Sequence, residues 1–295
     1  MLTLQPRQQL PEFTIVVRRL MTGSIRISCL LLLTCLLAAA VYAAEPTSAN
    51  DLYRTQAIVT GKGEKNRKLG FRDCLDRVLV RVSGDQRLLA KPQLAGLRDE
   101  AGALIASFKY RDRLEGIPIH DEQGSNDRPH DLTCFFDRAK VDATLASLGS
   151  QAWLAERPVV AVFLLVERGT KRFVLAADGD DDPYMDESFA GAAEPLAMQM
   201  VLPSKALLQT SGLAADTLRQ SSPAALDQAA KDAGGDVALL GHLAWSDKDL
   251  GWVADWRLAS NGTSYDWQAR GVGFDEAFRV AMRGAAQILS GNGQP

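Results

Sequence analysis

The chain has 295 residues, of which 46% are hydrophobic and 23% are charged, and its formal net charge at pH 7 is −3. This length and composition predict a globular protein that is long enough for two ordinary domains. The slightly acidic balance lacks the basic footprint that nucleic-acid binding requires, so we expect no nucleic-acid partner.

The start of the chain has the pattern of a Sec-type signal peptide. Arg18, Arg19 and Arg26 precede an apolar run, and Val41 and Ala43 stand where a signal peptidase reads small residues. We therefore expect a signal peptide at 1–43, cleavage after Ala43 and a periplasmic mature protein.

Two features of this segment stay open. The apolar run is shorter than a comfortable bilayer span and no later stretch is longer, so we expect no stable membrane span after cleavage. Retention of the segment as an anchor is the alternative. The true start is either Met1 or Met21. Removal of 1–43 takes away four arginines and one glutamate, which leaves a net charge of −6.

The mature chain reads as a polar leader at 44–51 followed by two α/β domains at 52–152 and 157–292. In the first domain, residues 52–61 alternate as a strand does. The apolar residues between 71 and 82 recur at helical spacing and form one face, with the charged residues turned outward. A helical piece at 93–107, a strand at 107–111, a long polar loop, a strand at 132–137 and a helix at 138–149 follow. We expect a mixed sheet packed with helices.

The mature chain keeps two cysteines, Cys74 and Cys134, and each falls on the apolar face of its predicted element. In an oxidising compartment such a pair forms a disulfide more often than not. A pair of plain buried thiols and a redox function are the alternatives, although a reactive thiol needs a cationic, partly exposed pocket.

The second domain opens on a strand at 159–167, which is apolar enough to be buried on both faces. A helix at 188–198, a short strand at 198–203, a helix at 223–233, a strand at 234–245 and a closing helix at 274–290 follow. Asn261-Gly262 predicts a two-residue hairpin turn between two antiparallel strands. These elements predict an α/β domain of α+β character with a mixed sheet.

The stretches "NRKLGFRDCLDRVLVRVSGD" and "FDRAKVDATLASLGSQAWLAERPVVAVFLLVE" resemble an uncharacterised proteobacterial family of exported proteins, a domain of unknown function. Its landmarks are a helix ending in "VLVRVSG" and a Trp-x-x-x-Arg-Pro motif, here Trp153, Arg157 and Pro158. The second domain is also similar, more weakly, to the amino-terminal domain of the Tol translocation protein. A similar likeness extends to curli-secretion and penicillin-binding-protein-activator lipoproteins. The resemblance implies an envelope accessory protein that is not an enzyme, but the lipoprotein signal is missing.

Four tryptophans fall on the strands around the predicted hairpin: Trp245, Trp252, Trp256 and Trp267. The two-residue turn sets the register, so Trp256 should face Trp267 and Leu258 should face Tyr265. We expect the closing helix to cover this aromatic stripe. A possible binding surface for a protein or glycan partner is the alternative.

An acidic segment, "DGDDDPYMDE", places Asp178, Asp180, Asp182 and Asp186 at positions that resemble a calcium loop. Pro183 stands where that loop needs a glycine, so a solvated acidic loop is the better interpretation and calcium the weak alternative. We expect no other metal and no cofactor.

Three histidines occur. His120 and His130 lie in the polar loop without the spacing of a zinc site, and His242 lies within a strand.

Taken together, these features predict a non-catalytic periplasmic accessory protein that acts by protein–protein interaction with an unknown envelope protein. A carboxylate-based hydrolase and a calcium- or glycan-binding module are the alternatives.

Overall fold

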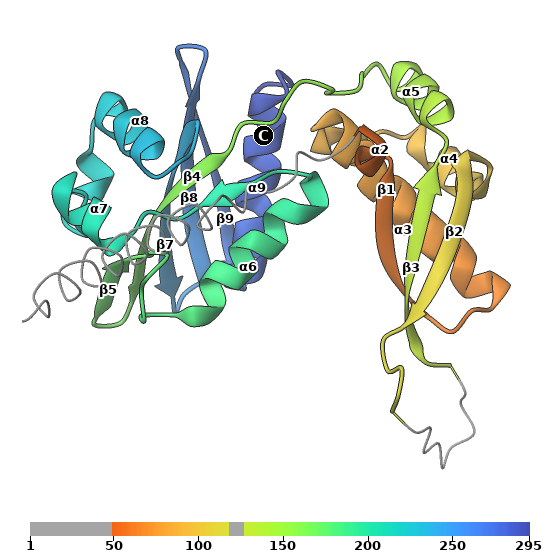
Figure 1. The fold of residues 1–295 in the computed structure, drawn as a ribbon, viewed down its shortest axis with the longest axis horizontal. Helices are drawn as coiled ribbons and strands as arrows, with labels where there is room; N and C mark the ends of the chain where they lie inside the picture. Colours follow the sequence, from red (N-terminus) through yellow and green to blue (C-terminus); the bar gives the residue numbers. More distant parts are fainter. Residues whose placement is uncertain (1–48, 118–126) are drawn as a thin grey trace, which may run out of the picture. The chain divides into compact units, whose positions relative to one another are not determined.

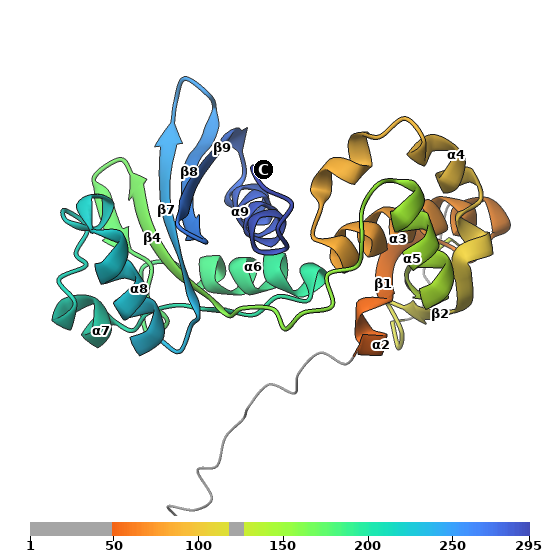
Figure 2. The same ribbon diagram turned by 90° about the horizontal axis from the view of Figure 1, so that it is seen from above.

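The computed structural model describes residues 49–117 and 127–295. The predicted signal peptide, most of the predicted polar leader and His120 lie outside the described residues. The described part of the chain forms one compact unit with two β-sheets, each packed with helices (Figures 1 and 2). This confirms the predicted fold class. Residues 150–159, which contain the predicted joint between domains, form no helix or strand.

The first sheet has the strand order β1-β3-β2 and is antiparallel throughout, whereas a mixed sheet was expected. Both flanking strands run opposite to β3, which follows β2 directly in the chain. The strands are β1 (Arg54–Thr60), β2 (Ile105–Asp112) and β3 (Pro129–Phe136). The α-helices are α2 (Ala49–Leu52), α3 (Glu64–Ser83), α4 (Leu94–Asp99) and α5 (Arg138–Ser147). Two short 3₁₀ turns are η1 (Gln86–Ala90) and η2 (Ala101–Leu104).

Helix α3 packs its apolar face on one face of this sheet, as its periodicity predicts (Figure 1). The helix crosses the sheet at Gly70, where a Cβ atom would lie 2.5 Å from Val59 and 2.6 Å from Leu132. Gly84 ends the helix with φ +72°, in the left-handed conformation that glycine adopts at low cost. Among the described residues, no helix covers the opposite face of this sheet, which we call its open face.

The second sheet is mixed, with the order β5-β4-β7-β8-β9 and β6 paired to β4. Its parallel pairs are β4 with β6 and β4 with β7. The strands are β4 (Val160–Arg168), β5 (Lys171–Val174), β6 (Met200–Val201), β7 (Val237–Ser246), β8 (Gly251–Ser260) and β9 (Thr263–Val272). The helices are α6 (Pro183–Ala193), α7 (Lys205–Thr210), α8 (Pro223–Asp232) and α9 (Phe274–Leu289), with 3₁₀ turns η3 (Glu194–Leu196) and η4 (Leu218–Gln220).

Helices cover both faces of the second sheet (Figure 2). Helices α6 and α9 pack on one face, and α7 and α8 pack on the other over β4 and β7. Strand β4 is buried along residues 160–166, as its unbroken apolar run predicts.

The predicted hairpin register is confirmed. Trp256 pairs with Trp267, Leu258 with Tyr265, and Ser260 with Thr263. Asn261 and Gly262 both have positive φ, +50° and +76°, as the predicted two-residue turn requires.

Several predicted boundaries differ from the structure, and one short helix was not expected. Helix α6 begins at Pro183 instead of 188, because the Asp182 side chain accepts a hydrogen bond from the Tyr184 amide and proline suits the first helical position. Strand β3 begins at Pro129 instead of 132, so His130 lies in a strand. The short helix α7 was not predicted; Ser204 caps it.

Candidate functional site

Strand β1 forms an edge of the first sheet, since β3 is its one strand partner among the described residues. The Gly61 amide donates to the Arg128 carbonyl at 2.8 Å, and the Phe136 amide donates to the Tyr53 carbonyl at 2.9 Å. In an antiparallel pair, hydrogen-bonded and non-hydrogen-bonded positions alternate along the strand. The odd-numbered residues of β1 therefore bond to β3.

The even-numbered residues of β1 direct their backbone groups toward the free edge. Their side chains are exposed, with Ile58 at 59%. Thr60 pairs with Pro129, which has no amide hydrogen to donate. This agrees with the assignment of the even-numbered residues of β1 to non-hydrogen-bonded positions. The Asn66 side-chain amide donates a hydrogen bond to the Thr60 carbonyl. This leaves the outward N–H and C=O groups of Arg54, Gln56 and Ile58 as a short template for pairing.

A stripe of α3 side chains runs beside this free edge. The close crossing at Gly70 brings the helix near the strand, and the chain reverses direction between β1 and α3. Leu69, which is 53% exposed, therefore lies at the Ile58 end. A hollow of about 320 Å³ lies between the two elements. Its lining residues are Ile58, Val59, Thr60, Asn66, Leu69, Gly70 and Asp73.

A second hollow of about 610 Å³ continues from Ile58 along β1 and onto the open face of the sheet. Five of its lining side chains are cationic and two are anionic, in a chain whose net charge is −3. The cations are Arg54, Arg77, Arg81, Lys109 and Arg111, and the anions are Asp131 and Glu194. We call the two hollows together the β1 groove. Its second part is a net positive surface.

The groove arginines are held in place by local partners. Arg54 lies 3.2 Å from Asp51, and Arg77 lies 3.0 Å from Asp73, one helical turn away. Both pairs are about half exposed, so each contributes little to folding stability and leaves its cation reachable by a ligand.

Two further cations lie on the open face of the sheet. Arg111 lies 2.5 Å from Asp131, whose side chain is 7% exposed. The Lys109 ammonium lies 5.5 Å from the centre of the Phe135 ring. Arg81 differs, because its guanidinium donates to three backbone carbonyls, those of Asp51, Glu194 and Pro195, and burial lowers its pKa.

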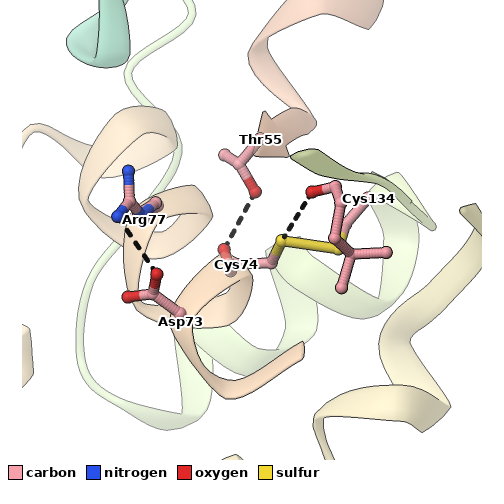
Figure 3. Close-up of a disulfide and its surroundings, with 6 residues drawn as sticks. Thr55, Asp73, Cys74, Arg77 and Cys134 are labelled. Atoms are coloured by element: carbon pink, nitrogen blue, oxygen red, sulfur yellow. Dashed lines mark hydrogen bonds and ion pairs between the residues drawn. A yellow bond between two sulfur atoms is a disulfide. The ribbon is translucent and has the colours of Figure 1, made fainter. Parts of the chain in front are cut away.

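The Cys74–Cys134 disulfide ties α3 to the central strand directly behind the β1 groove. The two Cα atoms are 6.4 Å apart, within the range for a disulfide, and both side chains are fully buried. Figure 3 shows Asp73 and Arg77 on the outer side of the helix, away from the bond. The predicted disulfide is thus present, and it fixes the helix wall against the sheet.

The backbone of Cys74 is also bonded to the edge strand. The Thr55 hydroxyl donates to the Cys74 carbonyl at 3.0 Å, from within the core (Figure 3). Strand β1 and helix α3 are therefore joined by a side-chain hydrogen bond beside the larger hollow, which Thr55 also lines.

The four tryptophans differ in exposure, and two of them are buried. Trp252 and Trp256 are 5% and 1% exposed, because α6 and α9 cover the face to which they point. The Trp267 indole donates to the Val280 carbonyl of α9 at 3.2 Å. Trp245, at the end of the stripe, is 40% exposed and its indole donates to Asp247. Helix α9 is the closing helix that was expected to cover the aromatic stripe, and it packs on Trp252 and Trp256.

The acidic residues of the weak calcium candidate have separate structural uses. Asp182 caps α6, and Asp186 lies within that helix instead of in a loop. Asp178 accepts a hydrogen bond from the Lys205 amide at 2.7 Å, and Asp180 lies 3.5 Å from the Lys205 ammonium. Within residues 49–117 and 127–295, no three His, Cys, Asp or Glu side chains are placed to hold a metal ion.

The two described histidines are bonded into their sheets. His130 is buried in β3, and its Nδ1 lies 2.7 Å from the Arg128 carbonyl oxygen. His242 in β7 lies 2.8 Å from Glu167, and this hydrogen bond is the first cause of a lowered Glu167 pKa. Asp255 is 3.7 Å from the other ring nitrogen, too far for a hydrogen bond.

The cations on the sheet were not predicted as a site. Arg54 was part of a predicted strand, but the alternation that exposes the even positions of β1 could have indicated an open face. Lys109 and Arg111 share that face because of their pairing with β3, which no local pattern specifies.

One comparison with known proteins gives a match. Residues 47–154, which contain the first sheet and most of the residues that line the β1 groove, match the family described as "Domain of unknown function (DUF8605)". This agrees with the expected domain of unknown function. A search of curated proteins gives no match. Among the helices of the described residues, none combines the length and the apolar character that a bilayer crossing needs.

Proposed function

We propose that this protein is a non-catalytic accessory protein of the bacterial envelope, exported to the periplasm, and that it acts by binding another protein in the β1 groove. The observation that carries the proposal is the net positive surface on the open face of a sheet whose other face is fixed by a disulfide. A rigid scaffold with one open, charged face suits binding.

The signal-like start and the disulfide support export. Positive residues, an apolar run and small residues at 41 and 43 are the features of a cleaved signal peptide. A disulfide between two buried cysteines suits an oxidising compartment.

The residues that could suggest catalysis make structural contacts instead, and this supports a binding role. His130 and His242 are held by partners within their own sheets, and Asp178 and Asp182 bond to backbone amides. A hydrolase would need such groups to converge on one reacting atom.

Export is tested by expression of the full chain in a Gram-negative host. The periplasmic fraction should contain a chain that begins at Ala44, with no free thiols under denaturing conditions. Recovery from the cytoplasm, with an intact leader and reduced cysteines, would contradict export.

Binding is tested by chemical cross-linking in the periplasm with charge-reversed variants. Arg54→Glu combined with Arg77→Glu should abolish the cross-linked product that the wild type forms. Lys248→Glu reverses an exposed cation in the turn between β7 and β8, outside the groove, and should leave the product unchanged. Equal yields from all three proteins would refute the β1 groove as the binding site.

A further inference from the structure

We propose that the partner binds by strand addition: an extended acidic segment of the partner protein pairs with the free edge of β1 and lies between β1 and α3. This inference rests on the proposed function and specifies the binding mode and the chemistry of the partner. The segment would become a fourth strand of the sheet β1-β3-β2.

One side of the β1 backbone has no strand partner among the described residues. Arg54, Gln56 and Ile58 direct N–H and C=O groups outward, and the strand is seven residues long. Proteins usually protect such an edge with a bulge, a proline or a covering segment. The register between β1 and β3 is regular from Arg54 to Thr60, and no proline stands in β1.

The groove beside that edge has two ends of different chemistry. Leu69 and Ile58, 53% and 59% exposed, form an apolar end, while Arg54, Arg77 and Arg81 line the other end. The two hollows share Ile58 and are therefore neighbours along the strand. An extended segment that pairs with β1 would place an apolar side chain at the first end and carboxylates at the second.

The charge of the groove favours an acidic partner segment. The larger hollow has an excess of cationic over anionic side chains, so carboxylates of a partner segment would meet complementary charge. A second copy of this chain would bring the same cations to the same edge. Like charges would then face each other, which disfavours a β1-to-β1 dimer.

The decisive variant is Gln56→Pro in the mature chain. Proline removes an outward amide hydrogen that is not bonded to β3, and its ring projects toward the incoming strand. Edge strands tolerate proline at such positions. The matched control is Gln56→Thr, which keeps the amide and suits a strand. Neither substitution changes the charge of the groove.

The probe is a synthetic peptide of the length of β1 that alternates glutamate and valine, and its control has glutamine in place of glutamate. We expect the glutamate peptide to bind the wild type and Gln56→Thr alike, and Gln56→Pro at least about tenfold more weakly. The glutamine peptide should bind the wild type about tenfold more weakly than the glutamate peptide. Salt should weaken binding of the glutamate peptide.

The outcomes separate this inference from the proposed function. If Gln56→Pro binds the glutamate peptide as the wild type does, while Arg54→Glu with Arg77→Glu does not, the groove binds acidic segments without strand addition and the inference is wrong. If the charge-reversed variant also binds normally, both proposals fail. A wild-type dimer that Gln56→Pro disrupts would identify a second copy as the occupant, against the inference.

Amide hydrogen exchange of the wild type tests the inference without any variant that must fold. Peptide binding should slow exchange at Gln56 and Ile58 and leave the amides of α9 unchanged. Unaltered exchange at both β1 amides in the peptide-saturated protein would overturn strand addition.

Discussion

The guanidinium of Arg157 lies over the indole of Trp153, 4.4 Å from the ring centre, and bonds to the ends of two helical elements. It donates to the Arg81 carbonyl in the last turn of α3 at 2.6 Å and to the Leu196 carbonyl at the end of η3. Burial lowers the pKa of Arg157 to about 10, and the nearby Arg81 charge adds to this effect. A partly buried cation here satisfies carbonyls that the helices leave without partners.

We predict that Arg157→Lys lowers the free energy of unfolding by on the order of 2 kcal/mol. Lysine keeps the charge, but it cannot reach both carbonyls with a planar fork. The control is Arg138→Lys, because Arg138 also lies over an aromatic ring, that of Tyr53, but its side chain is 52% exposed. Urea unfolding of both variants measures the difference. An equal decrease in the free energy of unfolding for the two variants would show that the carbonyl contacts of Arg157 do not contribute to folding stability.

The landmark Trp-x-x-x-Arg-Pro was visible in the sequence, but its role was not. Periodicity predicted the inward face of α3 and the two-residue turn at Asn261-Gly262 predicted the hairpin register, because both depend on local spacing. The bonds of Arg157 to α3 and η3 join residues distant in sequence, and only the tertiary fold brings them together. The β1 groove was missed for the same reason, since its cations come from β1, β2 and α3.

Local chemistry also explains the residues that were read wrongly. Asp182 and Asp186 were expected in a solvated acidic loop, with a calcium loop as the weak alternative. An aspartate followed by proline also starts a helix, and Asp182 and Pro183 start α6 in this way. The position of His130 in a strand instead of a loop follows from pairing with β1 and β2.

The second prediction concerns the disulfide. Replacement of Cys74 and Cys134 by serine should lower the free energy of unfolding by about 4 kcal/mol in the chain-entropy model, since the bond spans 60 residues. Because both side chains are fully buried, a mild reductant should leave the native wild type oxidised. Urea unfolding with and without reductant checks the first expectation, and thiol labelling of the native protein checks the second. Rapid labelling of the native protein would contradict the burial of the bond.

The third prediction compares two helical glycines. In α9, a Cβ atom at Gly284 would lie 2.5 Å from two indole atoms of Trp267, which the bond to Val280 holds in place. Gly284→Ala should therefore destabilise the protein by about 1–3 kcal/mol. In α6, nothing lies within 4 Å of a Cβ atom at Gly191, so Gly191→Ala should stabilise it by about 0.5–1 kcal/mol. Thermal unfolding of the two variants should give shifts of opposite sign, and shifts of the same sign would contradict the close packing of α9 on Trp267.

The last prediction concerns alkaline pH. The Tyr53 hydroxyl donates to Asp142 at 2.6 Å, and burial together with this carboxylate raises the pKa of Tyr53 from 10.0 to about 12. Between these values the unfolded chain releases a proton that the folded protein retains. The contribution of Tyr53 to stability is thus complete below about pH 10 and is lost as the pH rises through about 12.

Tyr53→Phe lacks this titration, so its free energy of unfolding should fall less steeply than that of the wild type between about pH 10 and 12. Urea unfolding across this range measures both slopes, and other alkaline titrations affect the two proteins equally. Tyr184→Phe is the control, because Tyr184 is 71% exposed and donates no side-chain hydrogen bond among the described residues. Equal slopes of the free energy of unfolding against pH for the wild type, Tyr53→Phe and Tyr184→Phe would show that the bond to Asp142 does not retain the proton of Tyr53.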